Sequence, residues 1–395
     1  MFTIDKDYVI KLRREIHMYP EIDFDLPKTV ALVKRELESM GIPYTEEYGK
    51  GSVVGYINPE KKGFTIGLRA DMDALRIEEK TNLPYSSKHE GLMHACGHDA
   101  HTAILLGAAK ALKEMESELN CRIKLLFQPS EEGIKSGAIM MVENGALDDV
   151  DIVSALHVSL MEKGKIGICS GAFMASSRHF KIEIFGKSAH ATAPHNGKDA
   201  LAAAVRMYNA VQLIISREVP PLEPCLCSIN KIEAGTAQNI VADHAVMLGT
   251  MRTFNMKLSE FMFDRINKIA KGLSDELGIK IEVTGPVKSV CTYNNPYLSE
   301  LMWTSASKIV GKENVVKTGM RLGSEDFSRM AEKRPGIFFV LGVRNDAKGI
   351  NKVAHNGYFD VDEDALETGS KVFVQFVLDN QNGVDTEKLE KCDEG

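Results

Sequence analysis

The residues with the clearest chemical potential lie in the stretch Gly91 to Ala103, GLMHACGHDAHTA. Cys96 and His98 are two residues apart, and thiolate and imidazole are the donors that zinc prefers in proteins. Gly97 between them would let the loop turn both side chains inward. A Cys-x-His pair alone is weak support for a metal site, because a buried polar turn at the start of a helix would give the same pattern.

Two adjacent carboxylates, Glu131 and Glu132, follow an apolar segment in FQPSEEG. Adjacent carboxylates repel each other, so a bound cation explains their coexistence better than bare water does. Neighbouring side chains of an extended segment point in opposite directions, so one could bind a metal while the other faces a substrate. A solvated surface loop is the alternative interpretation of the pair taken alone.

Two histidines at the ends of other apolar segments could complete a metal site. His157 ends the segment IVSALHV, and His355 follows another predicted strand and its loop in VAHNGYF. Either histidine alone is more typical of a hydrogen-bonded core residue. All five donors, however, fall just past predicted strands of one sheet, which favours a shared cation.

The elements that must position these donors alternate between strands and helices. Buried strands are predicted at Phe64 to Asp71, Arg122 to Gln128, Ile152 to Leu156 and Gly336 to Leu341, and an amphipathic helix at His101 to Leu119. Such alternation is typical of an α/β domain with a mainly parallel sheet flanked by helices. Ligands of such sheets bind beyond the carboxyl ends of the strands.

The middle of the chain has a different order, β-α-β-β-α-β, which is the split βαβ arrangement of ferredoxin-like domains. The predicted elements are strand Phe180 to Phe185, helix Asp199 to Ser216, strands Cys225 to Ile232 and Ala245 to Arg252, helix Leu258 to Leu277 and strand Lys280 to Val283. We therefore predict an inserted α+β domain over residues 178–294. The first domain is then discontinuous and comprises residues 1–177 and 295–395.

The composition excludes several classes of protein. The 395 residues are 44% hydrophobic and 26% charged, which is typical of a globular protein of about two domains. A formal net charge of -7 without a run of basic residues argues against nucleic acid as a partner. The chain begins without a secretory signal pattern, and its longest apolar stretch is too short to cross a membrane. Its 7 cysteines lack the spacing of a disulfide scaffold, so we expect a cytoplasmic protein with no membrane partner.

The donor motifs belong to longer strings that resemble the M20 peptidase family. In chain order these strings are LRREIHMYPEIDF, LRADMDAL, MHACGHDAHTA, FQPSEEG, GKSAHATAPH, GTAQNIVADHAVMLGTMR and LGSEDFS. They run from about Leu12 to Phe376 and are most similar to the amidohydrolase branch, with its aminoacylase-like, hippurate-hydrolase-like and auxin-conjugate-hydrolase-like enzymes. The combination of MHACGHDAHT with FQPSEEG is highly specific.

The resemblance implies a zinc-peptidase-like catalytic domain and a role for each matching residue. The implied metal ligands are Cys96, His98, Glu132, His157 and His355, and Glu131 would be the general base. The inserted domain would serve as a lid and as the surface of a homodimer or higher homo-oligomer. Its His190 would stabilise the oxyanion, often across subunits, while Asn239 and Arg252 would hold the carboxylate of the substrate.

The chain departs from two-zinc members of the family at Arg69-Ala70-Asp71, where those members carry a metal-binding His-x-Asp. One histidine ligand is then missing, so the resemblance leaves open one or two divalent ions. Zinc is the favoured metal, with manganese, cobalt and nickel as alternatives. Asp71 would orient a histidine ligand, as imidazole ligands usually require.

The resulting prediction is a metal-dependent amidohydrolase that removes an acetyl, benzoyl or similar group from an N-acyl amino acid. A dipeptidase or carboxypeptidase would use the same chemistry on a peptide bond. A non-catalytic protein that binds a metal or small molecule on this scaffold is the alternative from another class. Glu131 beside a full ligand set argues against that last alternative.

Overall fold

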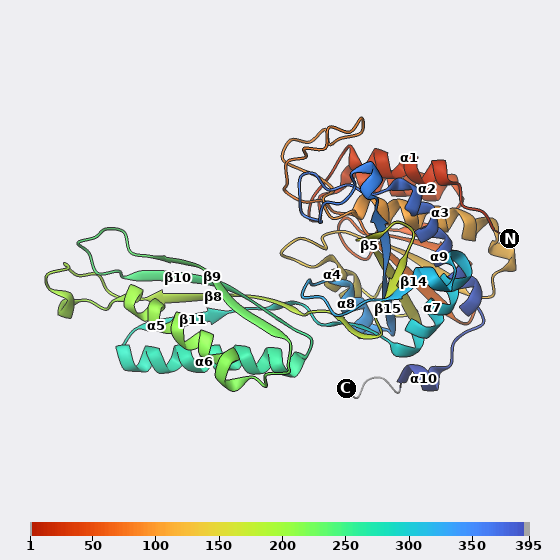
Figure 1. The fold of residues 1–395 in the computed structure, drawn as a ribbon. Helices are drawn as coiled ribbons and strands as arrows, with labels where there is room; N and C mark the ends of the chain where they lie inside the picture. Colours follow the sequence, from red (N-terminus) through yellow and green to blue (C-terminus); the bar gives the residue numbers. More distant parts are fainter. Residues whose placement is uncertain (1, 391–395) are drawn as a thin grey trace. The chain divides into compact units, whose positions relative to one another are not determined.

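An eight-stranded sheet forms the centre of one of two units in the computed structural model, which describes residues 2–390 (Figure 1). This first unit contains residues 1–173, 292–320 and 326–395. Its strand order is β1 (Tyr44–Thr45), β2 (Val53–Ile57), β4 (Arg122–Gln128), β3 (Thr65–Asp71), β5 (Ile152–Glu162), β15 (Gly336–Arg344), β6 (Ile166–Ile168) and β14 (Val315–Lys317). The central neighbours β4, β3, β5 and β15 are all parallel, whereas β2 and β6 join them antiparallel.

Helices cover the central sheet because its middle strands are apolar on both faces. Every residue of β3 is buried, as parallel strands covered on both sides require. Helix α1 (Lys6–His17) packs against α3 (His98–Glu114), α3 against α9 (Leu366–Asn380), and α9 against α7 (Pro296–Val310) (Figure 1). The short helices α4 (Gly137–Glu143) and α8 (Phe327–Lys333) form a second packed pair, while α2 (Pro27–Ser39) contacts β2 and α10 (Thr386–Glu390) contacts α7.

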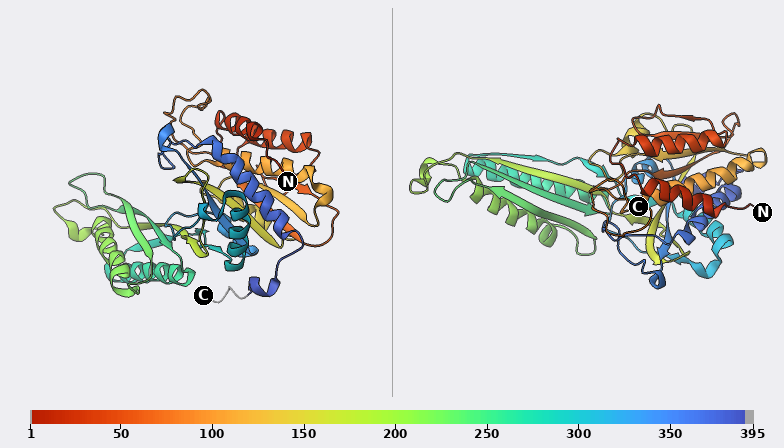
Figure 2. Two further views of the ribbon diagram at one scale, coloured as in Figure 1. Left: turned by 45° about the vertical axis from the view of Figure 1, so that its right-hand side comes forward. Right: turned by 90° about the horizontal axis from the view of Figure 1, so that it is seen from above.

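The second unit contains residues 174–291 and 321–325 and has its own apolar core. Its antiparallel sheet has the order β11 (Lys280–Thr284), β8 (Ser177–Phe185), β10 (His244–Thr253) and β9 (Cys225–Ala234), with β12 (Val287–Ser289) also paired to β8. Helices α5 (Ala200–Leu213) and α6 (Met256–Leu277) lie side by side on one face of this sheet (Figure 2). Burial alternates along β10, as expected for a sheet with one covered face.

These observations confirm the predicted fold class, an α/β domain with a mainly parallel mixed sheet together with a ferredoxin-like α+β domain. Helix boundaries differ in places. The helix expected from His101 begins at His98, and the helix expected to reach Ser216 changes to a π-helical turn at Ile214–Glu218. None of the helices among residues 2–390 is long and apolar enough to cross a membrane.

Candidate metal centre

The candidate ligands gather at one edge of the central sheet, where the parallel strands have their carboxyl ends. Asp71 ends β3 opposite Gln128, which ends β4. His157 lies within β5, paired with Val340 of β15. Because the strands run in the same direction, the segments that follow them meet at this edge.

A glycine turn presents the two candidate ligands of the Cys-x-His motif. Gly97 has a φ of 91° and forms the N-cap of α3, so Cys96 lies before the turn and His98 opens the helix. A Cβ atom at Gly97 would lie 2.4 Å from Cγ2 of Val158 on β5. Both the left-handed backbone and the close approach to β5 therefore require glycine.

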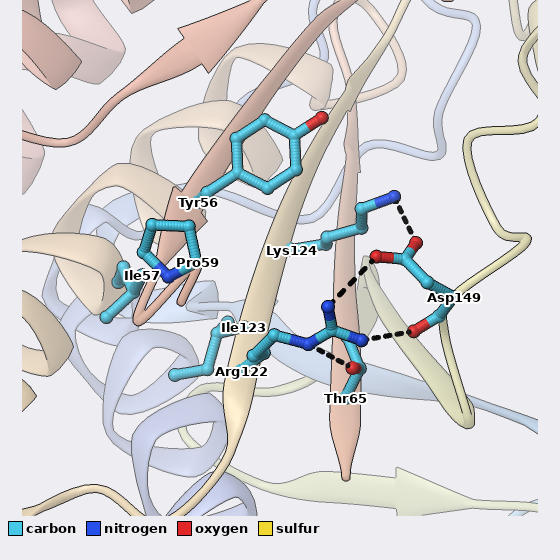
Figure 3. Close-up of a pocket in the computed structure, with 8 residues that line it drawn as sticks. All are labelled: Tyr56, Ile57, Pro59, Thr65, Arg122, Ile123, Lys124 and Asp149. Atoms are coloured by element: carbon cyan, nitrogen blue, oxygen red, sulfur yellow. Dashed lines mark hydrogen bonds and ion pairs between the residues drawn. The ribbon is translucent and has the colours of Figure 1, made fainter. Parts of the chain in front are cut away.

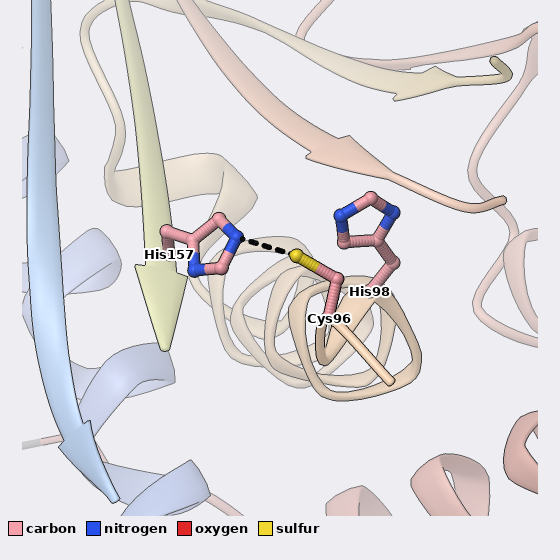
Figure 4. A group of neighbouring side chains, drawn as sticks. All are labelled: Cys96, His98 and His157. Carbon is pink, nitrogen blue, oxygen red and sulfur yellow. Dashed lines mark hydrogen bonds between the residues drawn. The ribbon is translucent and has the colours of Figure 1, made fainter. Parts of the chain in front are cut away.

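The ligand atoms form overlapping groups, and within each group they lie within 4.8 Å of one another. One group contains Cys96, His98 and His157, which converge from the α3 loop and β5 (Figure 4). Another contains Cys96, Glu132 and His355. The five residues expected as ligands are thus brought together, and the thiol of Cys96 is common to both groups.

Hydrogen bonds fix which nitrogen of His157 is available. Its Nδ1 lies 2.6 Å from the carbonyl oxygen of Val158, so Nδ1 carries the proton. Its Nε2 lies 3.3 Å from Sγ of Cys96 and faces the other ligands (Figure 4). Burial lowers the pKa of His157 to about 4, so the ring is neutral at physiological pH, as a metal ligand must be.

The surroundings of Cys96 and His98 favour a cation. Burial raises the pKa of the Cys96 thiol well above its ordinary value, so a thiolate there needs a positive partner. Burial alone would lower the pKa of His98, but the nearby carboxylate of Asp71 raises it well above its ordinary value. Neither ring nitrogen of His98 makes a hydrogen bond within residues 2–390, although the side chain is 1% exposed. Soft sulfur and imidazole donors next to carboxylates fit a divalent ion such as zinc.

Glu132 and His355 form the outer part of the ligand set. Nε2 of His355 lies 2.9 Å from Oε1 of Glu132, and the N–H of His355 donates to the carbonyl of Ala95 at 2.8 Å. Burial alone would raise the pKa of Glu132, but the hydrogen bond from His355 lowers this pKa to about 2. His355 has a φ of 62°, a left-handed backbone conformation that is uncommon for residues other than glycine.

Asp73 holds the two adjacent glutamates, and the sequence interpretation did not single it out. Its Oδ1 accepts the N–H of Glu131 at 2.9 Å, and its Oδ2 accepts the N–H of Glu132 at 3.0 Å. Its Oδ1 also lies 3.4 Å from Nδ1 of His98. Carboxylate oxygens of both glutamates lie in one group with His98, in contrast to the expectation that the pair would point apart, because residues 131–135 form bends instead of an extended strand. The second aspartate in LRADMDAL was the available signal.

Asp71 contacts a histidine outside the expected ligand set. Its Oδ1 lies 2.6 Å from Nδ1 of His101, and Nε2 of His101 accepts the N–H of Val158 at 2.9 Å. Its Oδ2 lies 3.6 Å from Nε2 of His98. Asp71 is therefore placed to orient both rings, of which only His98 has an uncommitted nitrogen.

The expected lid residues belong to the second unit and are described within it. His190 and Asn239 come from neighbouring segments, because His190 pairs with Ile240 in a β-bridge and the N–H of Ala191 donates to the carbonyl of Asn239. Both side chains are exposed. Arg252 on β10 donates to Thr250 and to the carbonyl of Met251, and no carboxylate of residues 2–390 pairs with it.

A separate surface pocket of about 220 Å³ lies at the opposite ends of the central strands (Figure 3). Thr65 and Arg122, the first residues of β3 and β4, line it. Lys124 and Arg122 both pair there with Asp149 (Figure 3). The two cations share this one carboxylate, and the pocket contains none of the metal-ligand candidates.

Soft and acidic candidate ligands lie together beside a further carboxylate at the carboxyl edge of an α/β sheet, an arrangement that suits a metal-dependent hydrolase. The chain belongs to the peptidase family M20/M25/M40, whose model matches residues 67–379, and within it to the amidohydrolase branch. Family membership makes the protein an enzyme of this metal-dependent hydrolase class.

Named relatives cover almost the whole chain. Thermostable carboxypeptidase 1 of Saccharolobus solfataricus is 39% identical over 92% of this chain and 93% of its own. N-acetyl-L-cysteine deacetylase of Bacillus subtilis is 39% identical over 92% of this chain and 86% of its own. The solved structure of Bacillus subtilis YXEP, described as a dinuclear metal binding peptidase of the M20 family, superposes with a TM-score of 0.79 at 31% identity and covers 94% of this chain and 97% of its own.

Proposed function

We propose that this protein hydrolyses the amide bond of N-acyl amino acids, such as N-acetyl or N-benzoyl amino acids, and releases a carboxylic acid and a free amino acid. The observation that carries the proposal is the convergence of Cys96, His98, Glu132, His157 and His355, with Glu131 in the same cluster. The deacetylase relative, named for an N-acetyl amino acid substrate, supports this class of substrate.

The five converging residues would hold one or two divalent ions, with zinc favoured over manganese, cobalt and nickel. Two donor groups that share Cys96 support a pair of ions, as does the similarity to the YXEP structure, which is described as dinuclear. A bound divalent ion supplies Lewis acidity that polarises an amide carbonyl and lowers the pKa of water.

Glu131 would act as the general base and then as the general acid. It would take a proton from the attacking water at its carboxylate and return that proton to the leaving nitrogen, and such help is worth about 10² to 10⁴-fold in rate. The carboxylate of Asp73 supports this role, because it fixes the backbone N–H groups of both Glu131 and Glu132.

Residues of the second unit would bind the substrate and its oxyanion. Arg252 has no carboxylate partner among the described residues, and its planar guanidinium matches the substrate carboxylate in two places. Asn239 would assist it. His190 would donate a hydrogen bond to the oxyanion, in its own subunit or in a partner copy, and the second unit would then serve as a lid.

We also propose a homodimer, or a higher homo-oligomer, through the second unit. Strand β9 is an open edge of its sheet, which can pair with a second copy. On α5, Leu201, Val205 and Tyr208 are exposed at spacings of four and three residues and form one apolar stripe. A cytoplasmic location is in keeping with Cys96, Cys121, Cys225 and Cys227, which form no disulfide bond.

A carboxypeptidase or dipeptidase is the second candidate function, and the 39% identity to a named carboxypeptidase favours it. The test is to incubate metal-loaded protein with N-acetyl and N-benzoyl amino acids beside matched dipeptides and to follow free amine. We expect chelator-sensitive release from the acylated set. Release from the peptides alone would establish the second candidate instead.

The Glu131→Gln variant is the control for that assay. We expect it to retain its metal and to lose about 10² to 10⁴-fold in kcat, because only the proton acceptor is removed. Metal content by elemental analysis and kcat on the best substrate measure the two effects. Turnover close to that of the parent protein would exclude Glu131 as the base.

A further inference from the structure

Arg69 is a buried cation that belongs to neither the ligand set nor the expected substrate contacts. It lies on β3 with 1% of its side chain exposed, at the position where the resemblance had pointed to a missing histidine ligand. Its guanidinium donates from Nε to Oε1 of Gln128 at 2.8 Å, from Nη1 to Oδ2 of Asp71 at 2.9 Å and from Nη2 to Oδ1 of Asp326 at 3.1 Å.

One branch of this network leads to the general base. Asp326 is fully buried, and its Oδ2 is also held by the hydroxyl of Ser136 at 2.6 Å. The backbone N–H of Asp326 donates to Oε1 of Glu131 at 3.3 Å. Arg69 thus fixes the residue whose main chain contacts the carboxylate of Glu131.

The other branch leads to the histidine ligands. Oδ2 of Asp71 accepts the hydrogen bond from Arg69, and its Oδ1 is hydrogen-bonded to Nδ1 of His101. The same Oδ2 lies 3.6 Å from Nε2 of His98. His101 in turn accepts the N–H of Val158, the residue next to His157. The rigid, forked guanidinium is the one side chain whose geometry can hold both branches and Gln128 at once.

We infer that Arg69 is a positioning residue that couples the orientation of the base Glu131 to that of the ligands His98 and His157. The inference rests on the proposed function for the role of Glu131, but its metal-binding branch does not depend on any substrate. A lysine at this position would keep the charge and lose the fork, so it could serve only one branch.

The test compares Arg69→Lys with Lys124→Met, a matched control at the other end of the sheet. Lys124 is also a buried cation, 4% exposed, and it pairs with Asp149 in the pocket of Figure 3. For Arg69→Lys we expect a zinc Kd, measured by chelator competition without substrate, that is about 10-fold weaker. We also expect kcat to fall about 10- to 100-fold with KM within about threefold. Lys124→Met should lower the urea midpoint while zinc Kd, kcat and KM stay unchanged.

Two further variants separate the branches and keep the test decisive if Arg69→Lys does not fold. Asp71→Asn should weaken zinc binding, whereas Asp326→Asn should lower kcat and leave the zinc Kd within about twofold. The inference would be overturned if Arg69→Lys left zinc Kd and kcat unchanged, or if the Lys124→Met control lost as much of both. It would also be overturned if Asp71→Asn lowered only kcat and Asp326→Asn weakened only zinc binding. If the parent protein hydrolysed no amide, the zinc affinities of Arg69→Lys and Asp71→Asn would still decide the metal branch, and the proposed function would fail separately.

Discussion

At the scale of single residues, the histidines of the motif MHACGHDAHTA differ in how many of their ring nitrogens make hydrogen bonds within the protein. His101 uses both nitrogens within the protein, so it cannot bind a metal as it stands. Neither nitrogen of His98 makes a hydrogen bond within residues 2–390, and His157 bonds the carbonyl of Val158 through Nδ1 while its Nε2 contacts the thiol of Cys96, another candidate ligand. His94 is also buried without a hydrogen bond within residues 2–390, yet it belongs to none of the donor groups. Convergence with other donors, and not burial alone, therefore identifies a ligand.

A pH-dependent stabilisation is expected from Glu79, which contacts His17 with Oε1 3.3 Å from Nε2. Burial alone would raise the pKa of Glu79, but hydrogen bonds from His17, Thr81 and the N–H of Ser87 lower this pKa to about 2. The folded-state pKa is lower than the unfolded one, so this stabilisation is complete above about pH 5 and is lost as the pH falls towards 2.

The Glu79→Gln variant tests this expectation by urea unfolding. It should lower the free energy of unfolding by about 1 to 2 kcal/mol at pH 6, because a charge-assisted hydrogen bond is lost. The difference from the parent protein should shrink at pH 3. The exposed Glu60→Gln serves as the control for the change in net charge, and an equal deficit at both pH values would contradict the assignment.

At the scale of elements, the sequence predicted strands and helices that are long and strongly patterned. The buried strands β3 and β4 were found where their apolar runs predicted them. The helices α4 and α8 were not predicted, since seven residues are too few for a helical repeat to be recognised. The start of α3 was placed three residues late, because its N-cap is a left-handed glycine with no capping side chain.

Part of the candidate site was also predictable, because it depends on local features of the sequence. Ligand types and their places after strands are visible in the sequence, so Cys96, His98 and Glu132 could be proposed from it. The contacts of Asp73 and Arg69 were not predictable, because they join residues far apart in the chain through a parallel register that sequence alone does not specify.

The turn at Gly97 yields a prediction about an element boundary. Gly97→Ala must place a Cβ against Val158 and adopt a left-handed backbone, so we expect a loss of about 2 to 3 kcal/mol in unfolding free energy. Zinc affinity should fall with it, because Cys96 and His98 flank the turn. Gly41→Ala is the control, since Gly41 has a φ of 66° with open space around it. Its zinc affinity should match that of the parent protein.

At the scale of the whole molecule, the proposed assembly through the second unit can be tested on α5. Val205→Glu places a charge in the apolar stripe, where Val205 is 51% exposed, and should convert a dimer into a 43.6 kDa monomer. Sedimentation velocity measures the mass. Leu222→Glu, at a position 96% exposed in a loop of the same unit, should leave the assembly intact. A monomeric parent protein, or equal behaviour of the two variants, would contradict the proposal.

The order of strands in the central sheet has a consequence for biosynthesis. Strand β15 lies between β5 and β6 but begins at residue 336, long after both have been translated. Residues 174–291 emerge from the ribosome earlier and have their own core. The nascent chain must therefore keep the unpaired edges of β5 and β6 from aggregating until residues 336–344 have been synthesised, and the set of five candidate ligands is complete only after His355 has left the exit tunnel.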